Sequence, residues 1–171
     1  NPKFPRGRDS HKIFGFNYRV TEIVGALGII QLKKLKKVVK YNFERYKIYK
    51  NVIKKFKKIK LRKIPTNNKG LCDCIIFNFE NRSITKKFVN EIKKHKIITK
   101  NVPDALEWHF AKYWDHIFTK FGISKKKLLN NFPKSSEHLE KSVSIFIYAT
   151  ESLNQVKSKA KKIENILNKL F

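Results

Sequence analysis

The stretch Gly15–Glu22, which reads Gly-Phe-Asn-Tyr-Arg-Val-Thr-Glu, joins a short polar and aromatic loop to the longest helical pattern in the sequence. Thr21 is a residue type favoured at helix N-caps, and Tyr18 and Arg19 place a phenol and a guanidinium just before the predicted helix. Free backbone N–H groups and the positive end of the helix dipole favour anions at such a start. We therefore expect this junction to suit a phosphate or a carboxylate.

From Thr21 to about Phe56, apolar residues recur at spacings of three and four, which predicts one long amphipathic helix. One stripe of this helix, at alternating spacings of four and three, consists of Leu35, Val39, Asn42, Tyr46, Tyr49, Ile53 and Phe56. Gly25 and Gly28 lie in the first turns, where each costs up to about 1 kcal/mol relative to alanine. Close approach of another backbone is the compensation we expect for this cost.

The remaining pattern predicts an α+β fold with a small antiparallel or mixed sheet of about three strands, covered on one side by helices. The expected strands are residues 72–79, 97–101 and 143–148. The expected helices are residues 84–95 with Ser83 as the cap, a Pro-started or Ser-capped helix within 132–140, and a final helix from Glu151 or Ser152. Residues 61–70 are expected to form a loop. We divide the chain into a loop segment, 1–20, and a domain, 21–171, led by the long helix.

The chain has 171 residues, 41% of them hydrophobic, which is enough for one domain with a real core. Its formal charge of +27 raises nucleic acid as a partner, and aromatics interleaved with lysine in residues 108–120 support that alternative. However, only six of the 40 basic residues are arginine, the residue that nucleic-acid interfaces favour. We therefore expect a surface of solvated lysines rather than a nucleic-acid interface. No apolar run approaches the ~18 residues that a membrane span requires.

The cysteines and histidines do not predict a metal site. Cys72 and Cys74 lack the second pair that a zinc site needs, so we expect reduced thiols and a cytoplasmic protein. His109 and His116 lie seven residues apart and lack a third ligand at suitable spacing. The sequence contains no methionine and opens without an apolar signal segment, so we expect it to be a fragment of something longer.

Two segments carry a family resemblance. The run Gly-Phe-Asn-Tyr-Arg-Val-Thr-Glu-Ile-Val-Gly-Ala-Leu-Gly-Ile-Ile-Gln-Leu-Lys-Lys-Leu, residues 15–35, resembles the segment that opens the C-terminal part of the DegT/DnrJ/StrS family of pyridoxal-phosphate-dependent sugar aminotransferases. The run Thr-Lys-Asn-Val-Pro-Asp-Ala-Leu-Glu-Trp-His-Phe, residues 99–110, is similar to the branch acting on 8-amino-3,8-dideoxy-manno-octulosonate, a sugar acid of bacterial lipopolysaccharide. The chain departs from the family at residues 144–146, where Ser-Ile-Phe stands in place of the usual Leu-Pro.

The resemblance implies a C-terminal small domain of the fold-type I pyridoxal-phosphate transferase fold. It implies transfer of an amino group, from glutamate, to a keto or aldehyde sugar for bacterial surface polysaccharide or lipopolysaccharide. By position, Asn17 would contact the phosphate of pyridoxal 5'-phosphate in a partner subunit, and Tyr18 and Arg19 would meet substrate anions. His109 is either a further substrate-binding residue or a packing histidine.

The resemblance also implies partners for this chain. They are a second copy, in a homodimer, or the large domain that the chain lacks. The Schiff-base lysine belongs to that domain, so we expect the chain alone to be inactive, with no catalytic residue of its own. A non-catalytic remnant of a truncated gene is a third reading.

Overall fold

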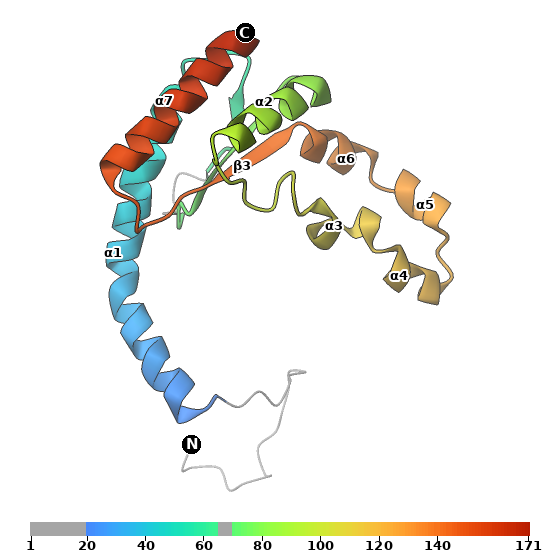
Figure 1. Ribbon diagram of the computed structural model, residues 1–171. Helices are drawn as coiled ribbons and strands as arrows, with labels where there is room; N and C mark the ends of the chain where they lie inside the picture. The colour runs from blue at the N-terminus through green and yellow to red at the C-terminus, as the bar shows by residue number, and fades with distance from the viewer. Residues whose placement is uncertain (1–19, 65–69) are drawn as a thin grey trace, which may run out of the picture. The chain divides into compact units, whose positions relative to one another are not determined.

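A computed structural model describes residues 20–64 and 70–171 of the chain (Figure 1). Its elements follow one another in the order α1 Glu22–Ile53, β1 Lys60–Leu61, β2 Cys74–Asn78, α2 Arg82–Lys94, α3 Leu106–His109, η1 Ala111–Tyr113, α4 Asp115–Phe118, η2 Thr119–Phe121, α5 Lys125–Asn130, α6 Pro133–Glu140, β3 Ser142–Phe146 and α7 Leu153–Leu170. The α+β class expected from the sequence is confirmed.

The chain divides into two units, residues 1–35 and 36–171, and α1 begins in the first unit and ends in the second. In the first unit, the Thr21 Oγ1 accepts a hydrogen bond from the Val24 backbone N–H at 3.4 Å, which is the contact expected of an N-cap. The predicted long helix and its start are therefore confirmed. The division into a loop segment, 1–20, and a domain, 21–171, stays a prediction.

The second unit is built on a three-stranded antiparallel sheet in the order β1-β2-β3. Ile75 pairs with Ile145 and Phe77 pairs with Val143, and all four side chains are buried on one face. A full strand was expected at residues 97–101, which is wrong. Thr99 makes an isolated bridge to Ile145, and the segment follows the edge of β3 through a few backbone hydrogen bonds without forming a strand. The third strand of the sheet is instead the two-residue strand β1, which pairs with β2 at the edge opposite β3.

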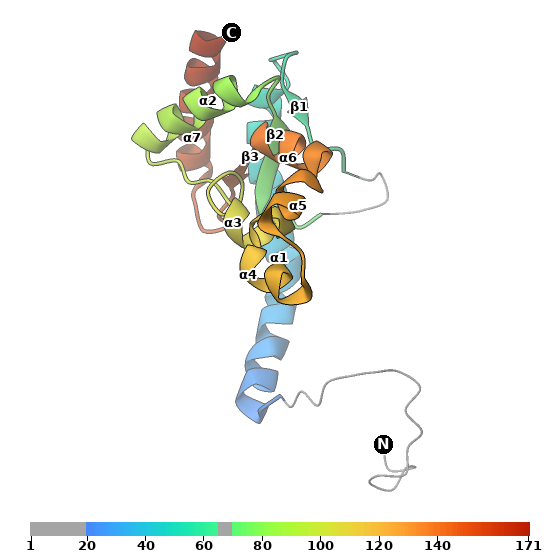
Figure 2. The ribbon, with the colours of Figure 1, turned by 90° about the vertical axis from the view of Figure 1, so that its right-hand side faces the viewer.

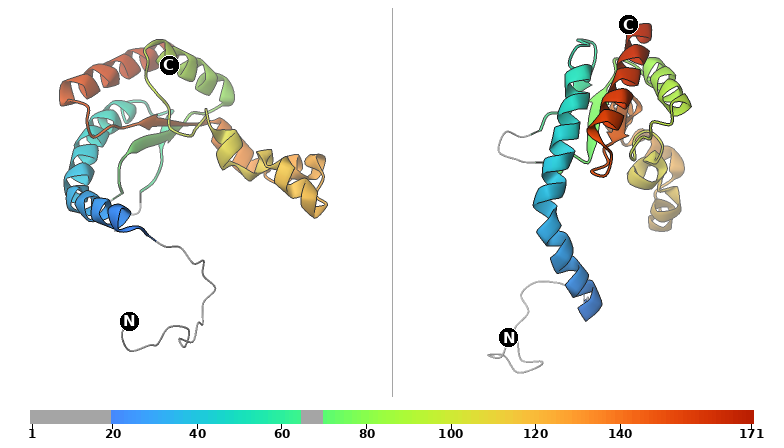
Figure 3. Two further views of the ribbon diagram at one scale, coloured as in Figure 1. Left: turned by 60° about the horizontal axis from the view of Figure 1, so that its bottom comes forward. Right: turned by 60° about the vertical axis from the view of Figure 1, so that its left-hand side comes forward.

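Two amphipathic helices, α2 and α7, lie side by side against the sheet (Figures 1 and 3). The predicted start of α7 is confirmed, because Ser152 and Gln155 form a reciprocal capping box. The expected cap of α2 at Ser83 is wrong. Asn81 is the cap, and its side-chain oxygen accepts a hydrogen bond from the Ile84 N–H at 3.0 Å. Starting the helix from Asn81 satisfies this N–H without using Ser83.

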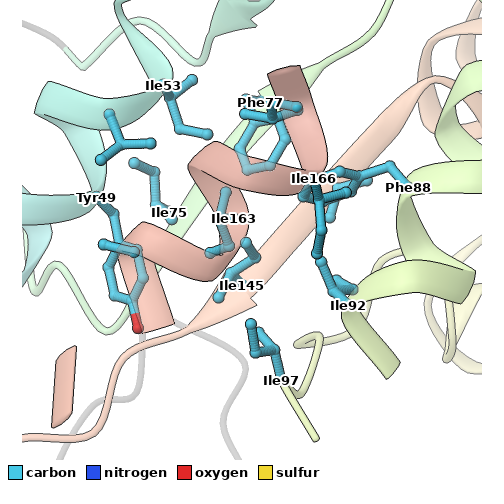
Figure 4. Packing of buried hydrophobic residues seen from close by; sticks show 14 of the residues in the cluster. Tyr49, Ile53, Ile75, Phe77, Phe88, Ile92, Ile97, Ile145, Ile163 and Ile166 are labelled. Carbon is cyan, nitrogen blue, oxygen red and sulfur yellow. The ribbon is translucent and has the colours of Figure 1, made fainter. Parts of the chain in front are cut away.

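Buried side chains from α1, α2, α7 and the sheet form one core (Figure 4). Within the second unit, Tyr46, Tyr49 and Ile53 of the predicted α1 stripe are buried, and they meet Ile75 and Ile163 in this core. The remaining helices α3 to α6 lie between α2 and β3 in sequence, and Figure 2 shows α6 in front of the strands. The core therefore holds α1, α2, α7 and the sheet together, and α3 to α6 form the connection from α2 to β3.

Candidate functional site

The residues expected to bind cofactor and substrate fall in two places. Asn17, Tyr18 and Arg19 lie outside the described residues, so their roles stay predictions. His109 is described, and it is the last residue of the short helix α3, with an exposed side chain. The site that the structure describes is thus the segment 98–113, which leads into α3 and past it.

Backbone hydrogen bonds hold the start of this segment along the outer edge of β3. The Lys100 N–H donates to the Ser144 carbonyl at 2.7 Å, and the Ser144 N–H donates to the Val102 carbonyl at 3.0 Å. The Phe146 N–H donates to the Ile98 carbonyl at 3.2 Å. The free backbone groups at this edge of β3 therefore bond to residues 98–102. Because this segment leads into α3, the sheet determines where α3 begins.

Asp104 anchors the next turn of the segment to α2. Its carboxylate accepts a hydrogen bond from the Lys93 Nζ at 2.7 Å and a second one from the Thr99 hydroxyl. Burial opposes ionisation of this carboxyl, but the two hydrogen bonds outweigh it and lower the pKa of Asp104 below its ordinary value. Asp104 is therefore ionised at neutral pH and fixes the loop before α3.

Pro103, Asp104 and Tyr113 border a hollow of about 250 Å³ that they share with Val89 and Lys93 of α2. Neither His109 nor Trp108 lines this hollow, and the Trp108 side chain is 80% exposed. Helix α3 therefore offers an imidazole and an indole face outward, where a ligand or another protein chain can reach them.

The aromatic residues after α3 do not form one core. Phe110 is buried and packs edge-on against Tyr113 and Phe132, at ring-centroid distances of 5.9 and 5.8 Å. Phe121 is exposed, and His116 lies on α4 rather than on a helix shared with His109. Among residues 20–64 and 70–171, no three histidine, cysteine or acidic side chains gather as a metal site would need.

Lysines in the described part of the chain all keep contact with solvent. The site segment contains two lysines. Lys112 donates a hydrogen bond to the Ser136 hydroxyl at 3.1 Å, and Lys100 pairs with Asp73 and lies 5.1 Å from the centre of the Phe146 ring. Neither cysteine is in a disulfide, and burial, followed by the charge of Asp73, raises the pKa of the Cys72 thiol. The Lys100 amine is therefore ion-paired, and the Cys72 environment favours the protonated thiol over the thiolate.

One buried charged residue was missed by the sequence interpretation. Arg45 lies next to the predicted stripe of α1, and its Nε donates to the Glu151 carbonyl at 2.9 Å while its Nη1 donates to the Tyr41 carbonyl at 2.8 Å. The bond to Glu151 ties α1 to the turn before α7, and the bond to Tyr41 lies within α1 and orients the guanidinium. The sequence did offer one sign that Arg45 would be buried. Arg45 follows Asn42 of the predicted stripe by three residues, and residues at i and i+3 share a helix face.

Comparison with known proteins places this arrangement in a family. Residues 3–163 match the family model described as the DegT/DnrJ/EryC1/StrS aminotransferase family. The match extends over most of the chain, including the segment before α1 and the segment around α3. No helix of the described residues is long and apolar enough to cross a membrane.

Solved structures with the same fold carry similar descriptions. PseC from Helicobacter pylori, an aminotransferase involved in the biosynthesis of pseudoaminic acid, is 18% identical with a TM-score of 0.67, over 98% of this chain and 43% of its own. The aminotransferase TlmJ from Streptoalloteichus hindustanus is 12% identical with a TM-score of 0.64, over 95% of this chain and 40% of its own. Spr1654 from Streptococcus pneumoniae, described as a sugar aminotransferase and solved in its PMP form, is 16% identical with a TM-score of 0.67, over 88% and 36%. This chain therefore spans about two fifths of the length of these relatives.

Proposed function

Because this chain belongs to the DegT/DnrJ/EryC1/StrS aminotransferase family, we propose that it is the C-terminal portion of a pyridoxal-phosphate-dependent sugar aminotransferase. The observation that carries the proposal is the family match over residues 3–163, and the fold likeness to aminotransferases supports it. The likeness to Spr1654, solved in PLP and PMP forms, supports the choice of cofactor.

When bound, pyridoxal phosphate supplies the electron sink for amino transfer, and the protein binds and orients the reactants. In our proposal, the Asn17 amide donates a hydrogen bond to a cofactor phosphate oxygen without adding charge. Arg19 and Tyr18 hold anionic groups of the substrate beside the start of α1, where the helix dipole favours them. In the same proposal, His109, which is exposed on α3, is a further substrate-binding residue.

The proposed substrate is a keto or aldehyde sugar, and the proposed amino donor is glutamate. PseC is involved in the biosynthesis of pseudoaminic acid, and the family resemblance of this chain favours a role in bacterial surface polysaccharide. The resemblance of residues 99–110 to the branch for 8-amino-3,8-dideoxy-manno-octulosonate narrows the proposal to that lipopolysaccharide sugar. We place the protein in the cytoplasm, which suits the free Cys72 and Cys74.

An exposed apolar face supports a protein partner for the first part of α1. Between residues 20 and 35, eight large apolar side chains are exposed, and they are Val20, Ile23, Val24, Leu27, Ile29, Ile30, Leu32 and Leu35. A cluster of this kind marks an interaction surface. We propose that it packs against the large domain that completes such an enzyme or against a second copy in a homodimer.

The Schiff-base lysine is proposed to lie outside this chain. A lysine that forms such an adduct at neutral pH is desolvated or placed beside another cation. No lysine of this sequence stands in a motif that resembles the Schiff-base site of the family, which supports this proposal. The chain alone is then inactive, and it becomes active only with the large domain.

The activity test compares the chain alone with the complete two-domain enzyme. Each is mixed with pyridoxal phosphate, glutamate and the keto sugar acid, and the formation of 2-oxoglutarate and of the amino sugar is measured. We expect product only from the complete enzyme. Product from the chain alone, with stoichiometric borohydride labelling at one of its lysines, would refute the proposal that the Schiff-base lysine lies outside this chain.

Asn17→Ala tests the cofactor contact in the complete enzyme. Loss of one hydrogen bond to a charged phosphate, worth about 1.5 kcal/mol, raises the dissociation constant of the cofactor about tenfold. Asn51→Ala is the matched control, because Asn51 is an exposed amide on α1 with no proposed contact to the cofactor. An unchanged cofactor affinity together with a lower melting temperature for Asn17→Ala would make Asn17 a structural turn residue.

The alternative of a nucleic-acid-binding module rests on the +27 charge. Electrophoretic mobility shifts with duplex and single-stranded DNA at low and raised salt distinguish it. A saturable complex that loses several orders of magnitude of affinity with salt would favour this alternative. Weak, unsaturable binding is the outcome that agrees with an aminotransferase domain.

A further inference from the structure

A second feature of the molecule lies in the unit 36–171, where a hollow of about 620 Å³ opens beside β1. Its cationic lining consists of Lys57, Lys58, Lys60, Arg62, Lys63 and Lys141. Glu80 is the carboxylate among the described lining residues, and Lys141 is already paired with Glu137 at 2.6 Å. Without Lys141, five cationic side chains and the single carboxylate of Glu80 remain, so the hollow carries an excess of four positive charges.

The strand register explains why these cations converge. Lys60 pairs with Asn78, which pairs with Ser142, so the three side chains form one row across the sheet. The Arg62 N–H donates to the Ile76 carbonyl at 2.9 Å, which places Arg62 in the next row. Because side chains alternate along a strand, Lys60, Arg62 and Asn78 lie on the face opposite the buried Phe77. The outer face of the sheet therefore presents donors side by side.

Helix α6 adds donors to the same face, and hydrogen bonds hold it there. The Asn78 Nδ2 donates to the Ser142 Oγ at 3.0 Å, and the Ser142 hydroxyl donates to the His138 carbonyl at 2.7 Å. The same Asn78 nitrogen lies 3.2 Å from the His138 Nε2, and the Phe79 N–H donates to the Lys141 carbonyl at 2.8 Å. His138 and Lys141 are thus positioned by contacts that a merely solvated lysine surface does not require.

From this arrangement we infer that the hollow binds a diphosphate, either as free pyrophosphate or as the diphosphate of a larger organic molecule. Like charges within a hollow focus the field and attract a multivalent anion. Residues two apart on one strand face stand about 7 Å apart, so Lys60 and Arg62 can hold two adjacent phosphate groups. Arg62 binds one group through its planar fork, and the lysines neutralise the remaining charge. The volume falls within the ~300–1,000 Å³ range of small-molecule sites.

The chain contains its own control for diffuse lysine charge. A second hollow, of about 820 Å³, lies between α2 and α7 and is lined by five lysines, Lys87, Lys93, Lys94, Lys162 and Lys169. Its described lining has no arginine, and Lys93 and Lys94 already pair with Asp104 and Glu91. If charge alone attracted the diphosphate, both hollows would bind it.

The test measures binding of pyrophosphate, ADP and inorganic phosphate to the complete chain by titration calorimetry at low and moderate salt. The variant Lys60→Gln/Arg62→Gln is compared with Lys162→Gln/Lys169→Gln, since each removes two exposed charges. We expect saturable one-to-one binding of pyrophosphate, weakened at least tenfold by the first variant and less than twofold by the second. Tighter binding of ADP than of pyrophosphate identifies an organic diphosphate, and the reverse order identifies the free ion.

Equal weakening by the two variants, or no saturable binding, would overturn the inference. Preference for an oligonucleotide over ADP, lost in the Lys60→Gln/Arg62→Gln variant, would also overturn it by making the hollow a nucleic-acid surface. Melting temperatures show whether each variant folds, and Lys57→Gln/Lys63→Gln repeats the test outside the strand if the first variant does not. The result does not depend on the aminotransferase activity, because the chain alone is titrated.

Discussion

The two parts of α1 have the same kind of periodicity but different surroundings. In residues 22–35, apolar side chains are exposed, and Leu27 retains 55% of its accessible surface. In residues 42–53 the stripe is buried, and Ile53 retains 1%. Leu35, which the sequence places on the same stripe as Ile53, is 45% exposed.

This difference teaches that periodicity identifies an apolar face but not the surface that covers it. The face of residues 42–53 is covered within its own unit, by the sheet and α7. Within the first unit, the described residues leave the large apolar side chains of 22–35 exposed. Burial of apolar surface gains about 25 cal/mol per Å², so an uncovered face of this length favours association with another surface.

The largest effect is expected from placing a charge in the covered part. Tyr46 is buried, and Tyr46→Asp introduces a carboxylate without a partner, which costs several kcal/mol. We expect loss of cooperative thermal unfolding, as measured by circular dichroism. Lys47→Asp is the control on the exposed side of the same turn, and it should fold. Similar melting temperatures for both variants would reject the assigned face.

Side-chain truncation compares the two parts directly. Ile53→Ala removes a fully buried side chain and should lower the free energy of unfolding by about 2–5 kcal/mol. Leu27→Ala removes an exposed one and should change the stability of the chain by less than about 0.5 kcal/mol. Urea denaturation of both variants measures this difference. A loss of 2 kcal/mol or more for Leu27→Ala would mean that the chain itself covers the first part.

The glycines of the first part provide a smaller and opposite effect. An added Cβ at Gly25 or Gly28 meets no heavy atom within 4 Å, so alanine should stabilise α1 by up to about 1 kcal/mol at each site. If a partner backbone approaches these glycines, the same substitutions should weaken association in the complete enzyme, as measured by sedimentation. Ala26→Gly controls for helix propensity alone. Stronger association of Gly25→Ala and Gly28→Ala would contradict a close backbone contact.

The smallest effect at neutral pH is expected at Tyr49. Burial, followed by the charge of Glu151, raises the pKa of this phenol above its ordinary value. The folded chain therefore holds the proton more tightly than the unfolded chain, and stability is present below about pH 10 and falls as the pH rises further. Tyr49→Phe should reduce this fall in melting temperature at high pH.

At pH 7 the same substitution should leave stability unchanged or raise it by about 1 kcal/mol. The Tyr49 hydroxyl is buried and has no hydrogen-bond partner among the described residues. A loss of more than 1 kcal/mol at pH 7 would mean that the hydroxyl is satisfied, for example by a buried water.

Local patterns were sufficient for several elements of the fold. The capping box at Ser152 and Gln155, the proline that starts α6 and the stripe of α7 each act within a few residues. The strands β2 and β3 were also predicted, because buried apolar runs of this kind leave few alternatives. The candidate site was less predictable. His109 was predicted as a site residue through the family resemblance, and that role stays a prediction. No local pattern indicated that Asp104 would bind Lys93, and the only local sign that Arg45 would be buried was its place three residues after Asn42.

By itself, the sequence determined the α+β class, the long helix, the terminal helix and the family to which the chain belongs, since these follow from spacing and motif within short segments. Only the tertiary structure decided that Lys60–Leu61 pairs with β2 while residues 97–101 make a single bridge to β3. A strand pair depends on the partner that arrives from elsewhere in the chain, and a two-residue strand carries no periodicity of its own. The same reason applies to the cations around β1, because the register that aligns Lys60, Asn78 and Ser142 joins residues far apart in sequence.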